Sequence, residues 1–529
     1  MTSRPGFVLE VDRSTPPILM WHGNSYRLER FPKGARILYP PEPQEPIKDP
    51  KSAIAQALES PTGDSKPLSA LLHKGMRLVI AFDDVSLPLP QMQAPDVRQM
   101  VIEAVLEKAA EHGVDDVYLI AALALHRRMT EGELRHALGA RVYDAFHPRK
   151  RLLQHDAEDP SNLVDLGTTE HGEVVEINKL AAEADLLVYV NINLVSMDGG
   201  HKSVATGLAS YRSIRHHHNV KTMVHSKSFM DMHNSELHTS NWRMGRHIAS
   251  QGVKIFQIET TLNTDTFPKP FEFLSKREWE WNLKDRTAFI ASSTSLQASP
   301  DWISRDIMHK IRSPYKLTGI NAGEVEAVHA KTLDKVFSQQ LVNVEGQSDI
   351  LTMGLPFVGP YNVNSIMNPI LVYCLALGYF FNMYIGKPLV RPGGVVIISH
   401  PNKAEFDPAF HPSYIDFYEQ VLTETTDPKE IEKRFEESFA NDPWYIHLYR
   451  KGNAYHGVHP FYMWYWGAHA LDHLGGVIIL GGDPKATRRL GFQPASTMMD
   501  AIEMAKSVVG PDPSITHLHS PPLVMAKVI

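Results

Sequence analysis

Short runs of β-branched and other apolar residues recur along this chain, separated by longer segments with apolar residues at three- and four-residue spacing. This alternation is typical of a parallel sheet covered by helices, because strands buried on both faces are apolar throughout and their connections are helical. Strands are predicted over residues 77–82, 116–123, 185–190, 253–258, 395–399 and 477–480, and helices over residues 95–112 and 131–138. The sequence therefore predicts an α/β fold.

The length of 529 residues predicts more than one domain. A Ser- and Thr-rich stretch over residues 291–314 follows a charged segment, which places a boundary near residue 300. We predict two domains, each with a mainly parallel sheet covered by helices, and a cofactor cleft between them. Their limits are residues 1–300 for the N-terminal catalytic domain, 301–485 for a C-terminal α/β domain with insertions, and 486–529 for a segment that packs back on the first domain.

Charge and composition narrow the class of ligand. There are 53 Lys and Arg residues against 60 Asp and Glu, giving a net charge of −7, and no run of five or six like charges occurs. A nucleic-acid footprint or a polybasic membrane patch needs such a cluster, so neither partner is predicted. We expect a small-molecule ligand, and the sequence leaves the oligomeric state open.

Localisation is predicted from cysteine use and from apolar stretches. The one cysteine, Cys374, has no partner for an internal disulfide, and the first residues contain acids where a secretory signal would need an apolar stretch, so a cytoplasmic protein is expected. Residues 366–385 are apolar and long enough to cross a bilayer, but Asn368, Pro369 and Asn382 interrupt them. We predict a buried core helix there, with a membrane span as the alternative.

Candidate site residues follow the first two predicted strands, at the carboxyl ends where ligands bind in open α/β sheets. Asp83, Asp84 and Ser86 come after the first strand, although such residues also form ordinary capped turns. His126 follows the second strand, immediately before a helix expected to start at Thr130. A neutral imidazole there would suit a general base near neutral pH, whereas a lone histidine is also a common structural residue.

The stretch after the third predicted strand is richest in chemistry. Gly199-Gly200 would let the backbone approach a ligand, and Lys202 could serve as a charge for an anion or as an amine nucleophile. The spacing does not match a phosphate-binding Walker loop, which excludes a nucleoside-triphosphate site. Three consecutive histidines end at His218, where a solvated helix end is the alternative interpretation.

A second group of histidines lies among aromatic residues near the end of the chain. It comprises His456, His459, His469 and His473, and four imidazoles could hold zinc or another transition metal. No cysteine and no HExxH motif completes a metal pattern, so we favour an aromatic segment that lines a pocket or fills a core.

Taken in order, these segments resemble the nickel-pincer lactate racemase family. The matching motifs are Asp84-x-Ser86-x-Pro88, His126-Arg127 followed by Met129-Thr130-x-x-Glu133-Leu134, Gln154-His155-Asp156, Gly199-Gly200-x-Lys202, Gly207-x-Ala209-Ser210-Tyr211 and His218-Asn219. They fall between about residues 80 and 220, and a weaker resemblance continues through Gly393-Gly394 and Gly481-Gly482-Asp483-Pro484.

The resemblance implies an enzyme that uses a nickel-pincer nucleotide, the nickel complex of pyridinium-3,5-bisthiocarboxylic acid mononucleotide. It implies that Lys202 tethers this cofactor, that His218 is the nickel ligand, and that Gly199, Gly200 and Ser86 help to bind it. His126 matches an acid/base histidine of the family, and we also predict catalytic roles for Asp84 and Arg127. The implied partners are a hydroxy-acid substrate and the proteins that make the cofactor.

The chain departs from the family at three places. Residues 367–371 offer no lysine where the family tends to have a substrate-contacting one, and two single positions also differ. Ile192 stands where the family has its second acid/base histidine, and Leu87 where it has a carboxylate-binding arginine. We expect these residues to make the pocket more apolar, with a histidine such as His201 or His217, or one of residues 456–473, replacing the lost base, and Arg127 or Arg128 the lost cation.

The predicted function is a nickel-dependent racemase or epimerase of a lactate-like or larger 2-hydroxy acid, an isomerase that works by hydride transfer to and from the cofactor. Three alternatives stay open. They are another hydride-transfer reaction with the same cofactor, a cofactor-free binding relative, and a metal hydrolase built on His456–His473.

Overall fold

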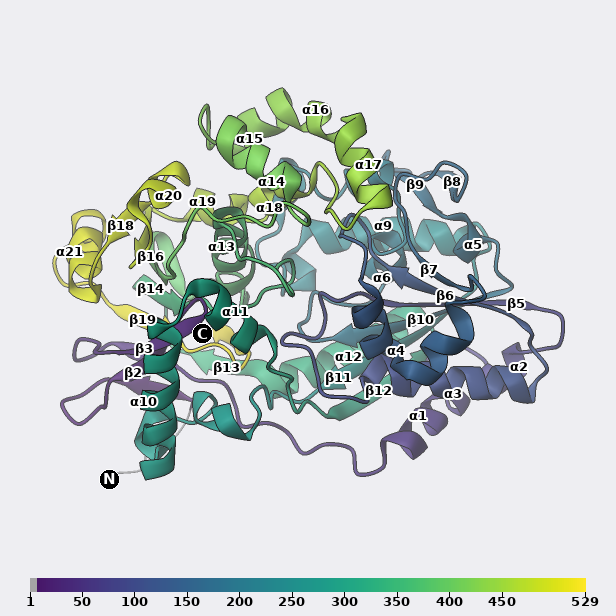
Figure 1. Cartoon of the computed structure of the whole chain (residues 1–529), viewed down its shortest axis with the longest axis horizontal. Coiled ribbons are helices and arrows are strands. Elements are labelled where there is room, and N and C mark those ends of the chain that lie inside the picture. Colours follow the sequence, from purple (N-terminus) through teal and green to yellow (C-terminus); the bar gives the residue numbers. More distant parts are fainter. Residues whose placement is uncertain (1–6) are drawn as a thin grey trace.

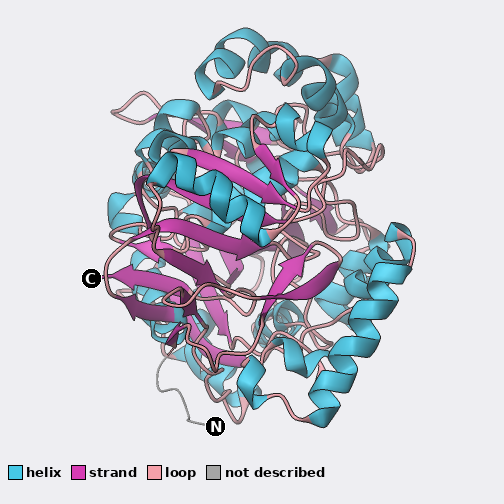
Figure 2. Ribbon diagram, turned by 90° about the vertical axis from the view of Figure 1, so that its left-hand side faces the viewer, coloured by secondary structure: helices cyan, strands magenta, loops and turns pink. Residues whose placement is uncertain are grey.

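The computed structural model describes residues 7–529, which fold into two large, mainly parallel sheets with helices packed against them (Figure 1). Figure 2 shows strands running through the middle of the molecule with helices on their outer sides. The predicted α/β class is confirmed.

The first sheet has six strands in the order β12-β11-β10-β5-β6-β7. All neighbouring strands are parallel except β11 and β12. Their bounds are β5 Arg77–Asp83, β6 Asp116–Ala122, β7 Leu152–Gln154, β10 Leu186–Asn193, β11 Ile255–Leu262 and β12 Leu317–Gly323. Four of these six were predicted from the sequence, with ends that differ by a few residues.

Helices cover both faces of this sheet, which explains why its central strands are apolar throughout; every residue of β10 is buried. The two predicted helices form as α3 (Val97–Glu111) and α4 (Glu131–Phe146). Thr130 caps α4, and the side chain of Glu133 returns a hydrogen bond to the Thr130 backbone, which completes a capping box. The helix therefore begins where the sequence indicated.

The second sheet has seven strands in the order β1-β4-β19-β14-β16-β17-β18. Only the β1–β4 pair is antiparallel. The bounds are β1 Val8–Glu10, β4 Arg36–Leu38, β14 Ser348–Gly354, β16 Val390–Ser399, β17 Gly476–Leu480, β18 Gln493–Ala495 and β19 Ile515–Leu518. Strands from both ends of the chain thus lie in one sheet, while β12, after residue 300, belongs to the other; the domain limits stay a prediction.

Three small sheets complete the strand content of residues 7–529. They are β13-β20-β15, β2-β3 and β8-β9. The bounds are β2 Ile18–His22, β3 Ser25–Glu29, β8 Leu163–Thr168, β9 Val174–Asn178, β13 Leu341–Val344, β15 Tyr384–Ile385 and β20 Met525–Val528. Strand β20 pairs with both β13 and β15, which ties the C-terminal segment to residues 341–344 and 384–385.

The remaining α-helices are short or lie on the outside of the sheets. They are α1 Pro50–Glu59, α2 Leu68–Leu71, α5 Lys179–Ala182, α6 Lys202–Ala205, α7 Tyr211–Ile214, α8 Val220–His225, α9 Glu236–Ser250, α10 Leu283–Ala298, α11 Asp301–His309, α12 Val325–Gln340, α18 His459–Tyr465, α19 Ala468–His473, α20 Pro484–Arg489 and α21 Met498–Val509.

Residues 369–380 of the apolar segment form a buried core helix, as predicted, and the segment's last residues form β15. Asn368 caps α13 (Pro369–Tyr373), which continues as a π-helical stretch, η4 (Cys374–Phe380), and all these residues are buried. Among residues 7–529, no helix is both long enough and apolar enough to cross a membrane.

The acidic stretch at residues 407–442 forms a helical group drawn in light green at the top of Figure 1. Its helices are α14 Pro412–Asp416, α15 Pro428–Ile431 and α16 Glu437–Ala440, followed by α17 Pro443–Lys451. Because α14 and α15 pack against α18, this group carries the aromatic segment that follows it.

Candidate functional site

A cavity of about 200 Å³ opens at the carboxyl ends of β5, β6 and β10. Ligands bind at this edge in open α/β sheets, because the connections that leave the strands diverge there. The opposite wall comes from residues 356–361 and from the core helix, with Trp466 and Leu523. Six predicted site residues line this one cavity: Asp84, Ser86, His126, Gly199, Lys202 and His218.

Asp84 and His126 form a hydrogen-bonded dyad on the cavity wall. Oδ2 of Asp84 lies 2.7 Å from Nδ1 of His126. Ser86 donates to Oδ1 of Asp84 through both its backbone nitrogen, at 2.9 Å, and its hydroxyl, at 2.5 Å. Burial alone would raise the pKa of Asp84, but the adjacent His126 and these hydrogen bonds outweigh it, so its pKa is lowered. An ionised Asp84 leaves Nε2 of His126 as the nitrogen available for proton transfer.

Asp83 also lines the cavity, and its carboxylate is held by residues of β10. Its Oδ2 accepts hydrogen bonds from Nδ2 of Asn191, at 2.5 Å, and from the backbone nitrogen of Ile192, at 2.6 Å, and Tyr189 donates to Oδ1. Burial raises the pKa of Asp83 to about 7 despite these bonds. The two adjacent acids thus differ: Asp84 is held ionised beside a histidine, and Asp83 takes up a proton in the neutral range.

Lys202 starts α6 and lies in the cavity beneath the Gly199-Gly200 turn. Its Nζ donates to the carbonyl oxygen of Met197 at 3.2 Å and lies 4.0 Å from Oδ1 of Asp198. Burial lowers the pKa of Lys202, although Asp198 opposes the shift. An amine whose pKa is lowered by its surroundings is more readily deprotonated, which is the condition for it to act as a nucleophile.

The glycine pair is required by close packing. Gly199 has φ of +89°, and a Cβ there would lie 2.4 Å from Nδ2 of Asn193 and 2.5 Å from Oε1 of Glu259. Gly200 has φ of +60° and donates its backbone nitrogen to the same Glu259 oxygen at 2.6 Å. Gly199 lines the cavity, whereas Gly200 lies behind it and anchors the turn.

His218 lies on the cavity wall between protein layers and is 8% exposed. Its Nδ1 is 2.7 Å from Nδ1 of the fully buried His217, and its ring contacts Tyr462 and Trp466, with centroids 5.4 and 5.7 Å away. Burial lowers the pKa of His218 well below its ordinary value, so the ring is neutral and has a lone pair for a metal. The solvated helix end considered from the sequence is wrong for these two histidines.

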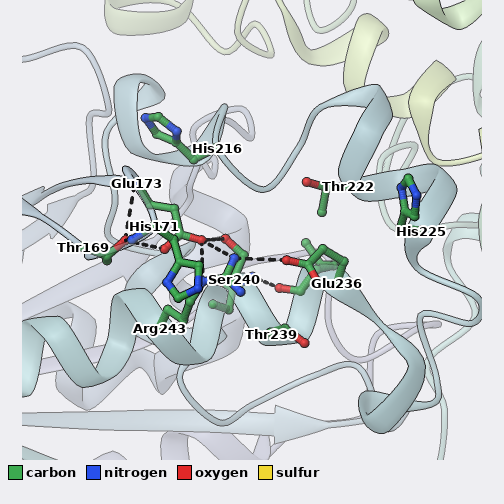
Figure 3. A network of polar contacts seen from close by, with 12 residues as sticks. Thr169, His171, Glu173, His216, Thr222, His225, Glu236, Thr239, Ser240 and Arg243 are labelled. Carbon is green, nitrogen blue, oxygen red and sulfur yellow. Dashed lines mark hydrogen bonds and ion pairs between the residues drawn. The ribbon is translucent and has the colours of Figure 1, made fainter.

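The loop that carries His218 is fixed by the β8–β9 hairpin. Ser213 both donates to the carbonyl oxygen of Glu176 and accepts from its backbone nitrogen, at 3.1 and 2.7 Å. In the turn between β8 and β9, Glu173 accepts hydrogen bonds from Ser240 and Arg243 of α9 (Figure 3). His216 stands apart from this network in Figure 3. The hairpin therefore holds the loop in place from the side opposite the cavity.

Arg127 is not brought into the cavity. Its guanidinium donates to both carboxylate oxygens of Glu133, at 2.7 and 2.9 Å, and to the carbonyl oxygen of Val363, and it packs over Phe410. Both charged side chains are buried, at 1% and 6% exposed. The pair fastens the start of α4 to residue 363, which gives Arg127 a structural role in place of the predicted catalytic one.

The replacements expected for the missing base and cation also lie elsewhere. Ile192 packs in the core on the far side of β10, so it does not make the pocket more apolar, whereas Leu87 does line the cavity. His201 is paired with Glu326 at 2.9 Å, and neither it, His217 nor Arg128 lines the cavity. Replacement by any of them is not supported by the geometry.

The four histidines of residues 456–473 do not form a metal site. They interact separately, with Glu158, Tyr414, Tyr384 and the carbonyl oxygen of Val390. Among residues 7–529, no group of three or more His, Cys, Asp or Glu side chains is arranged to hold a metal ion. The hydrolase alternative loses its basis, and the aromatic segment instead supplies Trp466 to the cavity.

Sequence reasoning missed the residues of the opposite wall. Tyr361 and Tyr379 both line the cavity, and their hydroxyl oxygens lie 2.7 Å apart. They are far from the recognisable motifs in the sequence, and only the π-helical turn of η4 and the loop after β14 bring them together. The apolar character of residues 366–385 was the one available signal, and it indicated burial without indicating a site.

The residues of the cavity suit the group that the resemblance implies. One buried amine and one neutral imidazole face the same space, and the glycine at 199 keeps the backbone free of a side chain there. A lysine can form the covalent tether and an imidazole can ligate nickel, so the donor set fits a tethered nickel-pincer nucleotide.

Comparison with known proteins agrees with this geometry. The family model of the lactate racemase N-terminal domain matches residues 26–231. Two lactate racemases are similar over part of the chain: one from Lactiplantibacillus plantarum, 27% identical over 172 residues, and one from Thermoanaerobacterium thermosaccharolyticum, 28% identical over 170 residues. These alignments cover 32% and 31% of this chain and 38% and 37% of the relatives, so the matched region spans less than half of their length.

Solved structures show the fold over a longer stretch. The lactate racemase apoprotein from T. thermosaccharolyticum superposes with a TM-score of 0.63 and 19% identity, covering 96% of this chain and 99% of that one. A structural-genomics target from Thermotoga maritima gives a TM-score of 0.50 at 13% identity, covering 92% and 100% of the two chains. Residues 26–231 thus match the lactate racemase N-terminal domain, and the whole chain shares the fold of a lactate racemase apoprotein, so the chain is lactate racemase-like.

Proposed function

We propose that this chain is a racemase or epimerase of a lactate-like or larger 2-hydroxy acid, and that it works with a nickel-pincer nucleotide. The observation that carries the proposal is the convergence of Lys202, His218 and His126 on one cavity. Lys202 would hold the cofactor covalently and His218 would ligate its nickel. When bound, the cofactor supplies a hydride acceptor and donor for the carbinol carbon of the substrate.

The protein itself handles the proton. His126 accepts the proton of the substrate hydroxyl at Nε2, because Nδ1 is held by Asp84. The resulting imidazolium is stabilised by the ionised Asp84, and the same nitrogen returns the proton when the hydroxyl is restored. The site is largely enclosed by buried side chains, which keeps water away from the reacting carbon.

The second candidate is a different hydride-transfer reaction with the same cofactor. It is favoured by the position of Ile192, which packs in the core where a racemase of this family would present a second histidine. Such an enzyme would release the 2-oxo acid and pass the hydride to a second substrate. The two candidates separate by product: inversion of configuration for the first, accumulation of 2-oxo acid for the second.

The test begins with cofactor attachment. The chain is co-expressed with a cofactor-making system, and intact mass, peptide mass and nickel per chain are measured. We expect an adduct on Lys202 and close to one nickel per chain. Lys202→Ala removes both, while Lys221→Ala, a change of an exposed lysine near His218, leaves both unchanged. An adduct retained in Lys202→Ala contradicts the proposal.

The reaction is then tested on the loaded protein. Chiral 2-hydroxy acids deuterated at the carbinol carbon are incubated with it, and configuration is followed by chiral chromatography. We expect inversion with the deuterium largely retained, because hydride returns from the cofactor and does not come from water. Loaded protein that inverts none of the acids and forms no 2-oxo acid would refute both candidates.

A further inference from the structure

The cavity wall beside His126 contains a pair of tyrosines joined through their hydroxyls. Tyr361 follows β14 and Tyr379 lies in the π-helical stretch η4, and their hydroxyl oxygens are 2.7 Å apart. Both residues are 8% exposed and line the cavity. π-helical turns are rare in proteins overall, but those that occur are often at functional sites, because they shift a side chain out of the regular helical register.

The pair has hydrogen-bonding capacity to spare. Only one of its two hydroxyl protons lies between the two oxygens, so the second proton is free to donate elsewhere. In the described part of the chain, neither hydroxyl has another hydrogen-bond partner. Burial raises the pKa of both tyrosines well above 10, so both stay protonated donors throughout the neutral range. A substrate oxygen within reach of the pair would therefore find one O–H group free to donate to it.

The pair also lies between the two histidines of the site. The ring of Tyr361 meets His126 edge-on with centroids 5.2 Å apart. The ring of Tyr379 stacks on Trp466 at 5.7 Å, and Trp466 in turn contacts His218. A substrate whose hydroxyl reaches His126 places its neighbouring substituent beside Tyr361 and Tyr379.

We propose that the Tyr361–Tyr379 hydroxyl pair binds the carboxyl group of the 2-hydroxy acid and sets substrate specificity through neutral hydrogen bonds. The substrate class rests on the proposed function; the oxygen-binding role rests on the tyrosine geometry. Neutral O–H donors form hydrogen bonds with a carboxylate or with an uncharged carbonyl oxygen alike. An arginine or lysine, in contrast, would favour the carboxylate. The surrounding Phe380, Trp466 and Leu87 favour a bulky apolar or aromatic substituent on the carbinol carbon.

Mandelate, mandelamide and 1-phenylethanol are the matched probes, because they share the carbinol carbon and the phenyl ring. The chain purified without cofactor is titrated with each by calorimetry. We expect mandelate and mandelamide to bind with dissociation constants within threefold of each other, and 1-phenylethanol, which lacks the carbonyl oxygen, to bind on the order of tenfold more weakly. Mandelate tenfold tighter than mandelamide would overturn the proposal, because a cation would then dominate.

The variants Tyr361→Phe and Tyr379→Phe keep the rings and remove the hydroxyls. Each variant should bind mandelate about tenfold more weakly and bind 1-phenylethanol as the wild type does. The preference for mandelate then disappears. General damage to the fold would weaken both probes equally. The control is Tyr373→Phe. Tyr373 lies on the same helix outside the cavity, and its buried hydroxyl has no hydrogen-bond partner among residues 7–529.

The outcomes separate the two proposals. Absence of mandelate binding to the wild-type chain, or a preference that survives in both tyrosine variants, would overturn the role of the pair. Failure of the proposed function would instead show as the absence of a Lys202 adduct and of nickel in the co-expressed protein. That measurement does not depend on either tyrosine.

Discussion

The carboxylate of Asp84 lies 2.7 Å from Nδ1 of His126, which decides which nitrogen of the imidazole is free to take a proton. This contact joins the ends of two neighbouring strands, β5 and β6, across 42 residues of sequence. The hydrogen bonds from Ser86 hold the carboxylate in position from its other side. The dyad therefore has a fixed orientation before any ligand binds.

Replacement of Asp84 by Asn should impair proton transfer. The Asn amide can donate to Nδ1, which favours the tautomer with its proton on Nε2, and that nitrogen then cannot accept one. We expect kcat for inversion by the loaded protein to fall on the order of 100- to 1000-fold. Ser86→Ala removes the hydrogen bond from the Ser86 hydroxyl to Asp84 and should lower kcat by at most about tenfold. A kcat within twofold of wild type in Asp84→Asn would show that the dyad is not used.

The buried Arg127–Glu133 pair should matter for stability and not for catalysis. Arg127→Met leaves the Glu133 carboxylate buried without its partner, which costs about 3–5 kcal/mol in the free energy of unfolding. Urea denaturation measures the loss. Arg141, which is 69% exposed, forms an ion pair with Glu107. Arg141→Met removes this pair and should lower the free energy of unfolding by less than about 1 kcal/mol. A direct catalytic role for Arg127 would appear instead as a lower kcat in protein that is still folded.

Gly199 should tolerate no side chain. A Cβ there combines a left-handed φ with contacts of 2.4 and 2.5 Å, so Gly199→Ala is expected to cost about 2–4 kcal/mol and to displace the Lys202 turn. Gly172 has a nearly equal φ of +87° with no atom within 4 Å, and Gly172→Ala should cost only about 1–2 kcal/mol. Chemical denaturation of both variants measures the difference, and equal losses would contradict a packing role for Gly199.

Asp83 should make the protein less stable as the pH rises. Burial raises its pKa to about 7 in the folded state, above the value near 3.8 of an unperturbed aspartate. The folded state therefore holds a proton that the unfolded state has lost, and this contribution is complete below about pH 4 and disappears as the pH rises through 7. Its size is on the order of a few kcal/mol.

Urea unfolding at pH 5 and pH 8 tests this dependence. Asp83→Asn imitates the protonated carboxyl and should reduce the loss of stability between the two pH values. Asp334→Asn, a change of an exposed aspartate, should leave the wild-type pH dependence intact. An Asp83→Asn profile that parallels the wild type would show that this carboxyl does not carry the effect.

Much of the site was predictable because its elements are local. The strands over residues 77–82, 116–123 and 185–190 carry their own apolar pattern, and each is followed at once by its polar residues. Parallel strands bring their carboxyl ends to one edge, so the pairing of β5 with β6 and β10 is enough to bring Asp84, His126 and Lys202 together. His218 follows within the same half of the sequence.

The sequence by itself determined the α/β class, four of the six strands of the first sheet and the motif residues on one side of the cavity. The tertiary structure decided the rest: that β1 and β4 join the second sheet, that Arg127 pairs with Glu133, that Ile192 faces the core, and that Tyr361 and Tyr379 form the opposite wall. The physical reason is the sequence separation over which each interaction acts. Hydrophobic periodicity and capping act over a few residues and are written in the local sequence, whereas burial, ion pairing and the choice of cavity wall depend on which distant segments pack together.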